Sequence, residues 1–348
     1  MSQNQEPTKK RKAEHIEIVL HRKVTGQGIT TGLERYRFRH EALPEINFAD
    51  ISLSTSFLGK PMKAPLLISS MTGGTNEAFQ INKNLAQAAE EHGWAMGLGS
   101  VRAAIEHPET AYTFRIRKYA PHIPLLANLG AVQLQYGYDV DDCRSIIELT
   151  EADALVLHLN AMQEVFQPEG NTRFAHLLSK IEKLCHTLEV PVGVKEVGMG
   201  IHGGLAKRLF DVGVQFVDVA GAGGTSWILV EKHRSRDPIL TAAAEAFADW
   251  GLPTADCIRE ARQQVPAGYL IASGGLSNGV EVAKAIALGA DLAGFGRSLL
   301  RAATESTPEA ISQQLQRIET ELRIAMFGIG VANIPSLKGT DRILRVDD

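Results

Sequence analysis

Short apolar segments recur along this chain at a regular interval, and this recurrence is the strongest constraint on its fold. Most of them begin about 24–38 residues apart, which is the size of one strand–helix unit. The segments are residues 65–69, 94–98, 124–128, 154–158, 192–196, 216–220, 269–273 and 292–295. Strands that are apolar along their whole length have both faces covered, as in a parallel sheet.

Helical patterns fill the intervals between the apolar segments. Residues 81–90 repeat apolar side chains at helical spacing, Ser277 is a candidate helix N-cap, and residues 309–326 carry a further apolar face. Alternating β and α segments, eight of each, predict an α/β protein with the (β/α)8 TIM-barrel architecture. Barrels of this kind carry their chemistry where the strands end.

The rest of the chain is arranged around this barrel. We expect residues 1–63 to form a polar, mobile N-terminal arm and a connecting segment, and residues 64–348 to form the barrel, within a single domain overall. Residues 226–268 are an insertion between the sixth and seventh strands. Its charged run, residues 231–238, is too polar for a core and predicts a surface loop that orders over the site.

Composition narrows the function classes. The net charge of the 348 residues is −4, so no general attraction to nucleic acid or to a membrane surface is predicted. Cys143, Cys185 and Cys257 are far apart, which disfavours a disulfide framework and a zinc cluster. No apolar run approaches the ~20 residues that span a bilayer, and the N-terminus lacks the apolar core of a signal peptide. We therefore expect a soluble, cytoplasmic protein.

Several predicted strand ends carry glycine and hydroxyl side chains. Residues 273–276 and 294–298 follow the last two strands, where barrels often bind a phosphate through backbone N–H groups, and Arg297 adds positive charge. Residues 69–74 and 220–225 place small side chains and hydroxyls at two further strand ends. This pattern suits a flat ring system lying across the barrel mouth, although ordinary turns have the same composition.

Charged and amide side chains stand at other strand ends. Lys195 would stabilise the anionic reduced form of a flavin, but a Schiff-base lysine or an ion pair with Glu196 fits the sequence as well. Arg102 could clamp a second anion and Asn128 could hydrogen-bond a ring, and a surface arginine and a turn former are the plain alternatives. Residues 9–12 are basic. They could belong to a solvated tail, or to an arm that closes over an anionic ligand.

The densest polar cluster follows the fourth predicted strand. His158 is a candidate general base or phosphate donor, or a buried structural histidine. Glu164 is a candidate Mg²⁺ ligand, because Mg²⁺ favours one or two carboxylates together with substrate phosphate. Gln163 does not titrate near neutral pH, so it can only orient a group or relay through hydrogen bonds.

Taken together, these motifs closely resemble the type 2, flavin-dependent isopentenyl-diphosphate isomerases. The motifs that carry the resemblance follow family order over nearly the whole chain. They are Arg11-Lys12 with His15, and residues 71–74, 99–102, 128–130, 158–164, 194–198, 223–225, 273–275 and 294–297. The segment 158–164 together with the Arg11-Lys12 pair is the most specific part.

The resemblance implies FMN, Mg²⁺, a reductant such as NADPH, a small diphosphate substrate, and a homotetramer or larger homo-oligomer. It implies FMN contacts from Met71, Thr72, Gly73, Ser100, Asn128, Lys195, Thr225, Gly274, Gly275, Ala293 and Gly294. It implies substrate contacts from Arg11, Lys12, Ser100, Arg102, His158, Asn160 and Gln163, with Glu164 on the metal. Lys195, His158 and Gln163 are then the candidate catalytic residues.

The implied reaction moves a double bond, so it needs both a general acid and a general base. The segment 158–164 offers no carboxylic acid free of the metal, and reduced FMN is therefore the expected acid–base group. Two alternatives remain. One is an FMN-dependent 2-hydroxy-acid oxidase, which needs a histidine base and paired arginines near the flavin. The other is a non-catalytic regulator that binds a flavin or a phosphate.

Overall fold

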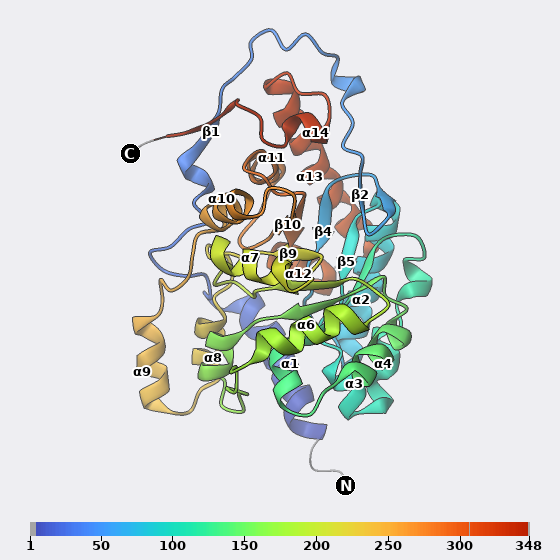
Figure 1. The fold of residues 1–348 in the computed structure, drawn as a ribbon, viewed down its shortest axis with the longest axis vertical. Helices are drawn as coiled ribbons and strands as arrows, with labels where there is room; N and C mark the ends of the chain where they lie inside the picture. The colour runs from blue at the N-terminus through green and yellow to red at the C-terminus, as the bar shows by residue number, and fades with distance from the viewer. Residues whose placement is uncertain (1–4, 306, 347–348) are drawn as a thin grey trace.

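In the computed structural model, which describes residues 5–305 and 307–346, eight parallel strands close into a barrel (Figure 1). The strands follow chain order, and β11 pairs with β4 to complete the ring. They are β4 (Leu66–Ile68), β5 (Ala95–Gly97), β6 (Leu125–Gly130), β7 (Ala154–His158), β8 (Val192–Lys195), β9 (Phe216–Asp218), β10 (Tyr269–Ala272) and β11 (Leu292–Phe295). The predicted (β/α)8 barrel is confirmed, and each predicted apolar segment overlaps one of these strands.

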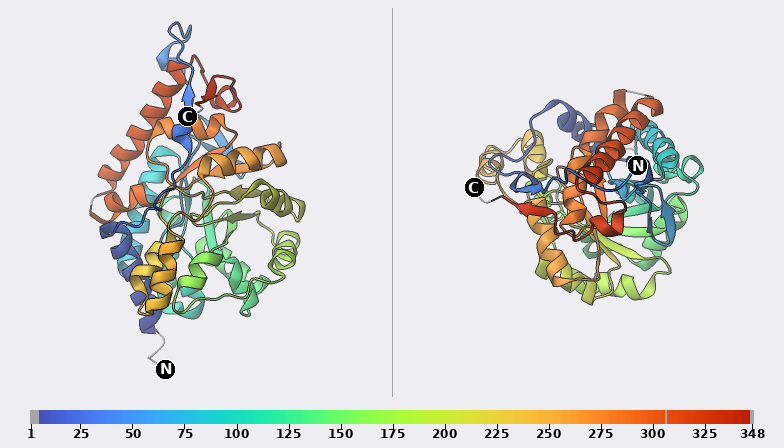
Figure 2. Two further views of the ribbon diagram at one scale, coloured as in Figure 1. Left: turned by 90° about the vertical axis from the view of Figure 1, so that its left-hand side faces the viewer. Right: turned by 90° about the horizontal axis from the view of Figure 1, so that it is seen from above.

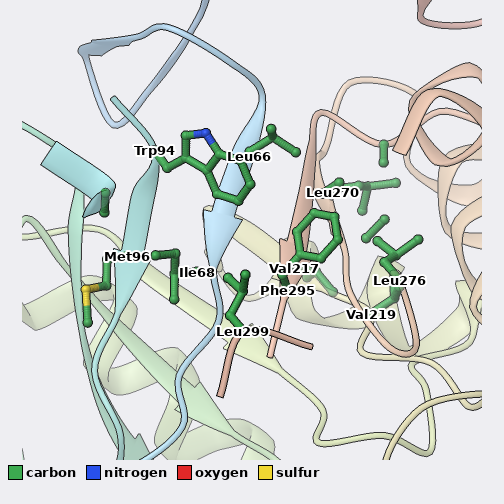
Figure 3. Close-up of a cluster of buried hydrophobic side chains, with 14 of the residues drawn as sticks. Leu66, Ile68, Trp94, Met96, Val217, Val219, Leu270, Leu276, Phe295 and Leu299 are labelled. Atoms are coloured by element: carbon green, nitrogen blue, oxygen red, sulfur yellow. The ribbon is translucent and has the colours of Figure 1, made fainter. Parts of the chain in front are cut away.

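Side chains alternate between the two faces of each strand. In β4, Leu67 belongs to the cluster that fills the barrel, whereas Leu66 and Ile68 pack toward the helices. Figure 3 shows part of this outer layer, in which Leu66 and Ile68 lie near Trp94 and Phe295. Both faces are buried, and this is why the strands are apolar throughout.

Helices cover the outside of the barrel, and the long α13 runs along one side of it (Figure 2). The helices are α1 (Gln5–His21), α2 (Asn76–His92), α3 (Arg102–Glu106), α4 (Val140–Thr150), α5 (Ala161–Phe166), α6 (Leu177–Thr187), α7 (Gly203–Asp211), α8 (Trp227–Arg234), α9 (Pro238–Ala246), α10 (Thr254–Gln264), α11 (Gly279–Ala287), α12 (Arg297–Glu305), α13 (Pro308–Gly328) and α14 (Ile334–Leu337). Five short 3-10 helices are η1 (Leu33–Arg35), η2 (Phe48–Asp50), η3 (Pro108–Phe114), η4 (Arg117–Tyr119) and η5 (Ala131–Gln135). Among the described residues, none of these helices has the length and apolar character needed to cross a membrane.

The predicted helical segments 81–90 and 309–326 lie within α2 and α13, so both predictions are confirmed. The predicted N-cap Ser277 is wrong. Asn278 caps α11, because its Oδ1 accepts the backbone N–H of Glu281 at 2.9 Å. Ser277 lies one residue earlier, and its own N–H donates to the Glu281 carboxylate at 2.7 Å.

The insertion differs from the expected surface loop. It forms α8 and α9 before α10, and the charged run at 231–234 is the last turn of α8. Glu231 is 0% exposed, because its carboxylate is hydrogen-bonded to His15, Gln163 and Arg234. Charge alone therefore misled the prediction, since a paired carboxylate can be buried.

The N-terminal arm also differs from the expected mobile tail. Residues 5–12 belong to helix α1, which packs against α8 and α12, while residues 1–4 lie outside the described residues. After α1 come β1 (Tyr36–Phe38) and the hairpin of β2 (Thr55–Phe57) and β3 (Lys60–Met62). Strand β1 pairs antiparallel with β12 (Ile343–Arg345), so segments from both halves of the chain meet there.

The hairpin covers the floor of the barrel. Phe57 is 3% exposed and belongs to the cluster inside the barrel. Its ring meets Phe216 edge-on at 5.2 Å between centroids and stacks on Tyr269 at 4.9 Å. Aromatic contacts of this kind add to the free energy of burial, so the hairpin stabilises the end of the barrel opposite the strand carboxyl ends.

We predict that Phe57→Ala lowers the free energy of unfolding by about 3–5 kcal/mol, because it leaves a cavity under two aromatic rings. Urea denaturation would show a lower midpoint with an unchanged slope. Ile239→Ala on α9 is the control, since Ile239 is 77% exposed and its truncation should cost less than about 0.5 kcal/mol. Equal effects of the two substitutions would contradict the role of the hairpin.

Candidate active site

A cavity of about 660 Å³ opens at the carboxyl ends of the barrel strands. The loops after all eight strands contribute to its wall, and helix α1 forms one side of it. Its volume is within the usual range for a small-molecule site, and its position is the one at which TIM barrels carry out chemistry.

Most of the residues selected from the sequence meet at this cavity. Those in its wall are Arg11, Lys12, Met71, Thr72, Ser100, Arg102, Asn128, His158, Asn160, Gln163, Glu164, Lys195, Thr225, Gly274, Gly275 and Gly294. Gly73 and Ala293 are not in the wall. Gly73 packs so closely on the ring of Phe114 that a Cβ would overlap it, and Ala293 packs in the layer between strands and helices.

Three ionisable side chains lie side by side on neighbouring strands. His158 of β7 pairs in register with Lys195 of β8, and Lys195 pairs with Asp218 of β9. Paired residues of adjacent strands point to the same face of a sheet. The Asp218 carboxylate accepts a hydrogen bond from Ser273 Oγ at 2.7 Å and one from the backbone N–H of Ala220 at 3.2 Å. A cation therefore lies between an imidazole and a carboxylate in the barrel interior.

His158 is neutral in this environment. Burial and the nearby Lys195 ammonium lower the pKa of His158 from 6.5 to about 3. The Nδ1–H of the neutral ring donates to Asn128 Oδ1 at 2.8 Å, which leaves Nε2 as an acceptor. His158 therefore has no second N–H to offer a phosphate oxygen until the ring takes up a proton.

The Lys195 ammonium does not form the ion pair with Glu196 that the sequence allowed. Lys195 Nζ donates to the backbone carbonyl of Glu196 at 2.5 Å. The Glu196 carboxylate instead accepts the backbone N–H groups of Val197, Gly198 and Met199 at 2.6, 2.7 and 2.5 Å. Lys195 is one of the residues that line the cavity.

The polar cluster after β7 is held by its own hydrogen bonds. Asn160 Nδ2 donates to Glu164 Oε1 at 2.8 Å and lies 3.3 Å from Gln163 Oε1. The backbone N–H of Asn171 donates to the other Glu164 oxygen at 2.5 Å. Glu164 is 7% exposed, and the carboxylate therefore has one fixed orientation in the cavity wall.

Glu231 is a residue of this region that sequence reasoning missed. Gln163 Nε2 donates to its Oε1 at 3.1 Å, and His15 Nε2 lies 2.9 Å from the same oxygen. Burial alone raises the pKa of Glu231, but the hydrogen bond and charge of His15 and the charge of Arg234 outweigh burial and lower it below 4.5. The four apolar residues 227–230 directly before Glu231 were the available signal, since they indicate a packed helix.

One face of α1 lines the cavity. Arg11, Lys12 and His15 supply its polar half, and Ile16 with Val19 supplies its apolar half. Lys12 Nζ donates to the backbone carbonyl of Ser100 at 3.4 Å and lies 5.4 Å from the centre of the Phe114 ring. The basic cluster is therefore part of an ordered helix.

The glycine-rich loops after β10 and β11 form another part of the cavity wall. Helix α12 begins there, so its free N–H groups and Arg297 are available to an anion. The start of α11 is not equivalent, because Asn278, Glu281 and Glu321 already accept the N–H groups near it. The predicted phosphate position is thus narrowed to the Gly274-Gly275 turn and the first turn of α12.

Comparison with known proteins identifies the family. The profile of the family described as "FMN-dependent dehydrogenase" matches residues 5–114 and 144–344. An isopentenyl-diphosphate delta-isomerase of Oceanobacillus iheyensis is 54% identical over 333 residues, which cover 96% of this chain and 95% of that protein. This chain belongs to the family of FMN-dependent isopentenyl-diphosphate delta-isomerases. The resemblance seen in the sequence is confirmed.

Further relatives agree. The isopentenyl-diphosphate delta-isomerase of Nostoc sp. is 52% identical and covers 97% of each chain. Among solved structures, a lactate oxidase of Pediococcus acidilactici superposes with a TM-score of 0.68 at 17% identity, covering 100% of this chain and 96% of that chain. A mutant flavocytochrome b2 with pyruvate bound gives a TM-score of 0.70 at 17% identity, covering 95% of this chain and 82% of that chain. These two likenesses show the barrel fold.

The cavity wall fits the flavin for which the family is named. Ser69 Oγ, Asn160 Oδ1 and Ser298 Oγ are buried without a hydrogen-bond partner among the described residues, and all three residues line the cavity. Buried polar atoms normally have partners, so these atoms mark places that a bound group would complete. Ser298 lies in the first turn of α12, at the expected phosphate position.

The donor set also fits a single Mg²⁺ that is shared with a substrate. The described residues contain no group of three or more histidine, cysteine or acidic side chains that could hold a metal alone. Glu164 and the unpaired Asn160 Oδ1 are neighbouring oxygen donors, and Mg²⁺ commonly completes such a site with phosphate oxygens and water.

We predict that His158 stays neutral down to about pH 5 in the folded protein. Because its folded pKa of about 3 lies below the ordinary 6.5, its contribution to stability is complete above pH 6.5 and is lost as the pH falls toward 3. NMR of ¹⁵N-histidine protein would show one neutral imidazole resonance that disappears in His158→Gln. A ring that titrates near its ordinary pKa would contradict this environment.

Proposed function

We propose that this protein interconverts isopentenyl diphosphate and dimethylallyl diphosphate, a 1,3-allylic rearrangement in isoprenoid biosynthesis, with FMN and Mg²⁺. The observation that carries the proposal is the cationic face of α1, which lies in the same cavity as the Glu164 carboxylate and the glycine-rich loops. A diphosphate needs the first two features, and a flavin phosphate needs the third. The printed names of the 54% and 52% identical relatives support the same activity.

The diphosphate is proposed to bind between α1 and the loops after β5 and β7. Its contacts are Arg11, Lys12, Ser100, Arg102, His158, Asn160 and Gln163, with Mg²⁺ on Glu164. Arg102 is held by a hydrogen bond from its Nε to Glu106 at 2.7 Å, which leaves the outer guanidinium nitrogens for phosphate. The negative charge of the substrate would raise the pKa of His158 and let both ring nitrogens donate.

The flavin is proposed to lie on Met71, Thr72, Ser100, Asn128, Lys195, Thr225, Gly274, Gly275 and Gly294, with Gly73 and Ala293 packed behind them. When bound and reduced, for example by NADPH, FMN would supply the acid–base group for the allylic proton shift. Lys195, which lines the cavity, would stabilise negative charge on the ring through its ammonium. Gln163 would orient the bound substrate, because Glu231 and Asn160 fix both ends of its amide.

Three further features complete the proposal. Residues 1–63 are an arm and a connecting segment of a single-domain protein whose residues 64–348 form the barrel. The protein forms a homotetramer or larger homo-oligomer, and its location is cytoplasmic. Three free cysteines support a reducing compartment.

The two alternative functions fit the cavity less well. A 2-hydroxy-acid oxidase needs a histidine base and paired arginines near the flavin, yet residues 269–277 contain neither histidine nor arginine. The similarity to oxidases, at 17% identity, supports a shared fold and not a shared activity. A regulator that only binds FMN would have little use for the ordered cluster of Asn160, Gln163 and Glu164.

One assay separates the three functions. The protein is incubated under argon with FMN, Mg²⁺, NADPH and isopentenyl diphosphate, and formation of dimethylallyl diphosphate is followed. We expect turnover that stops when FMN or Mg²⁺ is omitted. Oxygen consumption with a 2-hydroxy acid would favour the oxidase, and the absence of both activities would favour the regulator.

We predict that the KM for isopentenyl diphosphate rises between about pH 6 and about pH 9, by up to about tenfold per unit above pH 7. Burial, with the charges of Arg11 and Arg102 outweighing that of Glu106, lowers the pKa of Lys12 to about 7, so this ammonium is lost as the pH rises. Lys12→Arg should give a flatter profile, because arginine stays charged.

The control for this profile is Lys207→Arg, since Lys207 is an exposed partner of Asp211 on α7. Ionisation of the substrate is common to all three proteins, and only the difference between them reports on Lys12. Parallel profiles in all three would exclude Lys12 as the titrating group.

A further inference from the structure

A cluster of five charged side chains lies behind the polar half of α1, and the proposed reaction does not use its centre. That centre is Arg234, at the end of α8. Its Nε donates to Glu14 Oε2 at 3.0 Å, its Nη1 to Glu231 Oε2 at 2.6 Å and its Nη2 to Glu169 Oε1 at 2.9 Å. Arg11 Nη1 lies 3.6 Å from the same Glu169 oxygen. We call these five residues the Arg234 cluster.

The cluster joins three parts of the chain. Glu14 lies on α1, Glu231 on α8, and Glu169 in the segment between α5 and α6. The Arg234 side chain is only 8% exposed, so its charge is screened less than that of a surface arginine. A planar guanidinium can address three carboxylates in three fixed directions, which a lysine ammonium on a flexible stem does not reproduce.

These contacts decide where the polar face of α1 lies. The helix packs on α8 and α12, and its Ile16 and Val19 are buried. Apolar packing is not directional, whereas the hydrogen bonds that Arg234 donates to Glu14 and that His15 donates to Glu231 fix the rotation and height of α1 against α8. The same rotation turns Arg11 and Lys12 toward the cavity.

Glu169 has two cationic partners at unequal distances. Arg234 is a hydrogen-bond donor at 2.9 Å, and Arg11 is only within ion-pair distance at 3.6 Å. A carboxylate that is already hydrogen-bonded to one guanidinium holds a second one less strongly, and a diphosphate would therefore draw Arg11 away at little cost. Without Arg234, Glu169 would be free to pair fully with Arg11.

We propose that Arg234 is a positioning residue for the diphosphate site: it fixes α1 so that Arg11 and Lys12 face the cavity, and it keeps Glu169 from competing with phosphate for Arg11. The substrate class rests on the proposed function, but the positioning of an anion-binding helix does not. Arg234 itself is absent from the cavity wall, as the described residues define it, and acts only through its neighbours.

The test uses the FMN-loaded full-length protein with Mg²⁺ and inorganic pyrophosphate as a non-reacting probe. Arg234→Lys and Glu14→Gln each weaken the hydrogen bond that ties α1 to α8, the first at the donor and the second at the acceptor. We expect the pyrophosphate Kd to rise about tenfold in Arg234→Lys and about threefold in Glu14→Gln. We also expect faster amide hydrogen exchange within α1, without a change in FMN affinity or in the exchange of α13.

Glu169→Gln is expected to change the pyrophosphate Kd in the opposite direction. It removes the carboxylate that competes for Arg11 while leaving the bond between Arg234 and Glu14, so the pyrophosphate Kd should fall about twofold or more. A residue with a merely structural role would not shift affinity in opposite directions in Arg234→Lys and Glu169→Gln. Arg144→Lys is the matched control, since Arg144 also binds two carboxylates, Asp141 and Glu189, and lies outside the cavity wall.

An unchanged pyrophosphate Kd in Arg234→Lys would overturn the proposal, and so would a Kd that rises in Glu169→Gln. These readouts need no turnover. A protein that fails to isomerise isopentenyl diphosphate but shows these shifts would contradict the proposed function and leave the positioning role intact. If the protein turns over normally, KM should follow the pyrophosphate Kd, and kcat should change less than KM.

Discussion

The hydrogen bonds between β11 and β4 close the sheet, and the arrangement of the cavity depends on that closure. A closed parallel sheet has no edge strands, and it gathers the carboxyl ends of all eight strands on one face. Residues as distant in sequence as Thr72, His158 and Gly294 thereby reach one cavity. The hairpin at the other end fills the floor with aromatic rings. Charges interact more strongly in such a buried, low-dielectric interior than they do in water.

Each charged group in this interior has a specific neighbour that limits its behaviour. Lys195 lies between His158 and Asp218 in the register, and it contributes to keeping the imidazole neutral. Glu231 is fully buried yet anionic, because His15, Gln163 and Arg234 all approach it. The cations of α1 and the N-terminus of α12 both line the cavity. One cavity therefore offers both cationic side chains and helix N–H groups to anionic ligands.

The barrel could be predicted because its signal is local. A strand covered on both faces must be apolar, and the regular spacing of such segments needs no knowledge of tertiary contacts. The candidate residues after β7 were found for the same reason, since they follow a recognisable strand. Glu231 was not found, because its burial depends on partners 68 and 216 residues away in sequence. A charged run looks the same in sequence whether water or an arginine satisfies it. The order in residues 5–12 was missed likewise, since α1 depends on packing against α8 and α12.

The packing of α1 has a consequence for synthesis of the protein on the ribosome. Helix α1 is made before α8 and α12, the two helices against which it packs, and these emerge on the order of 200 residues later or more. Until then Ile16 and Val19 have no native surface to cover them. The nascent chain therefore carries α1 without its native packing partners through most of translation, and this helix of the cavity wall is among the last elements to dock.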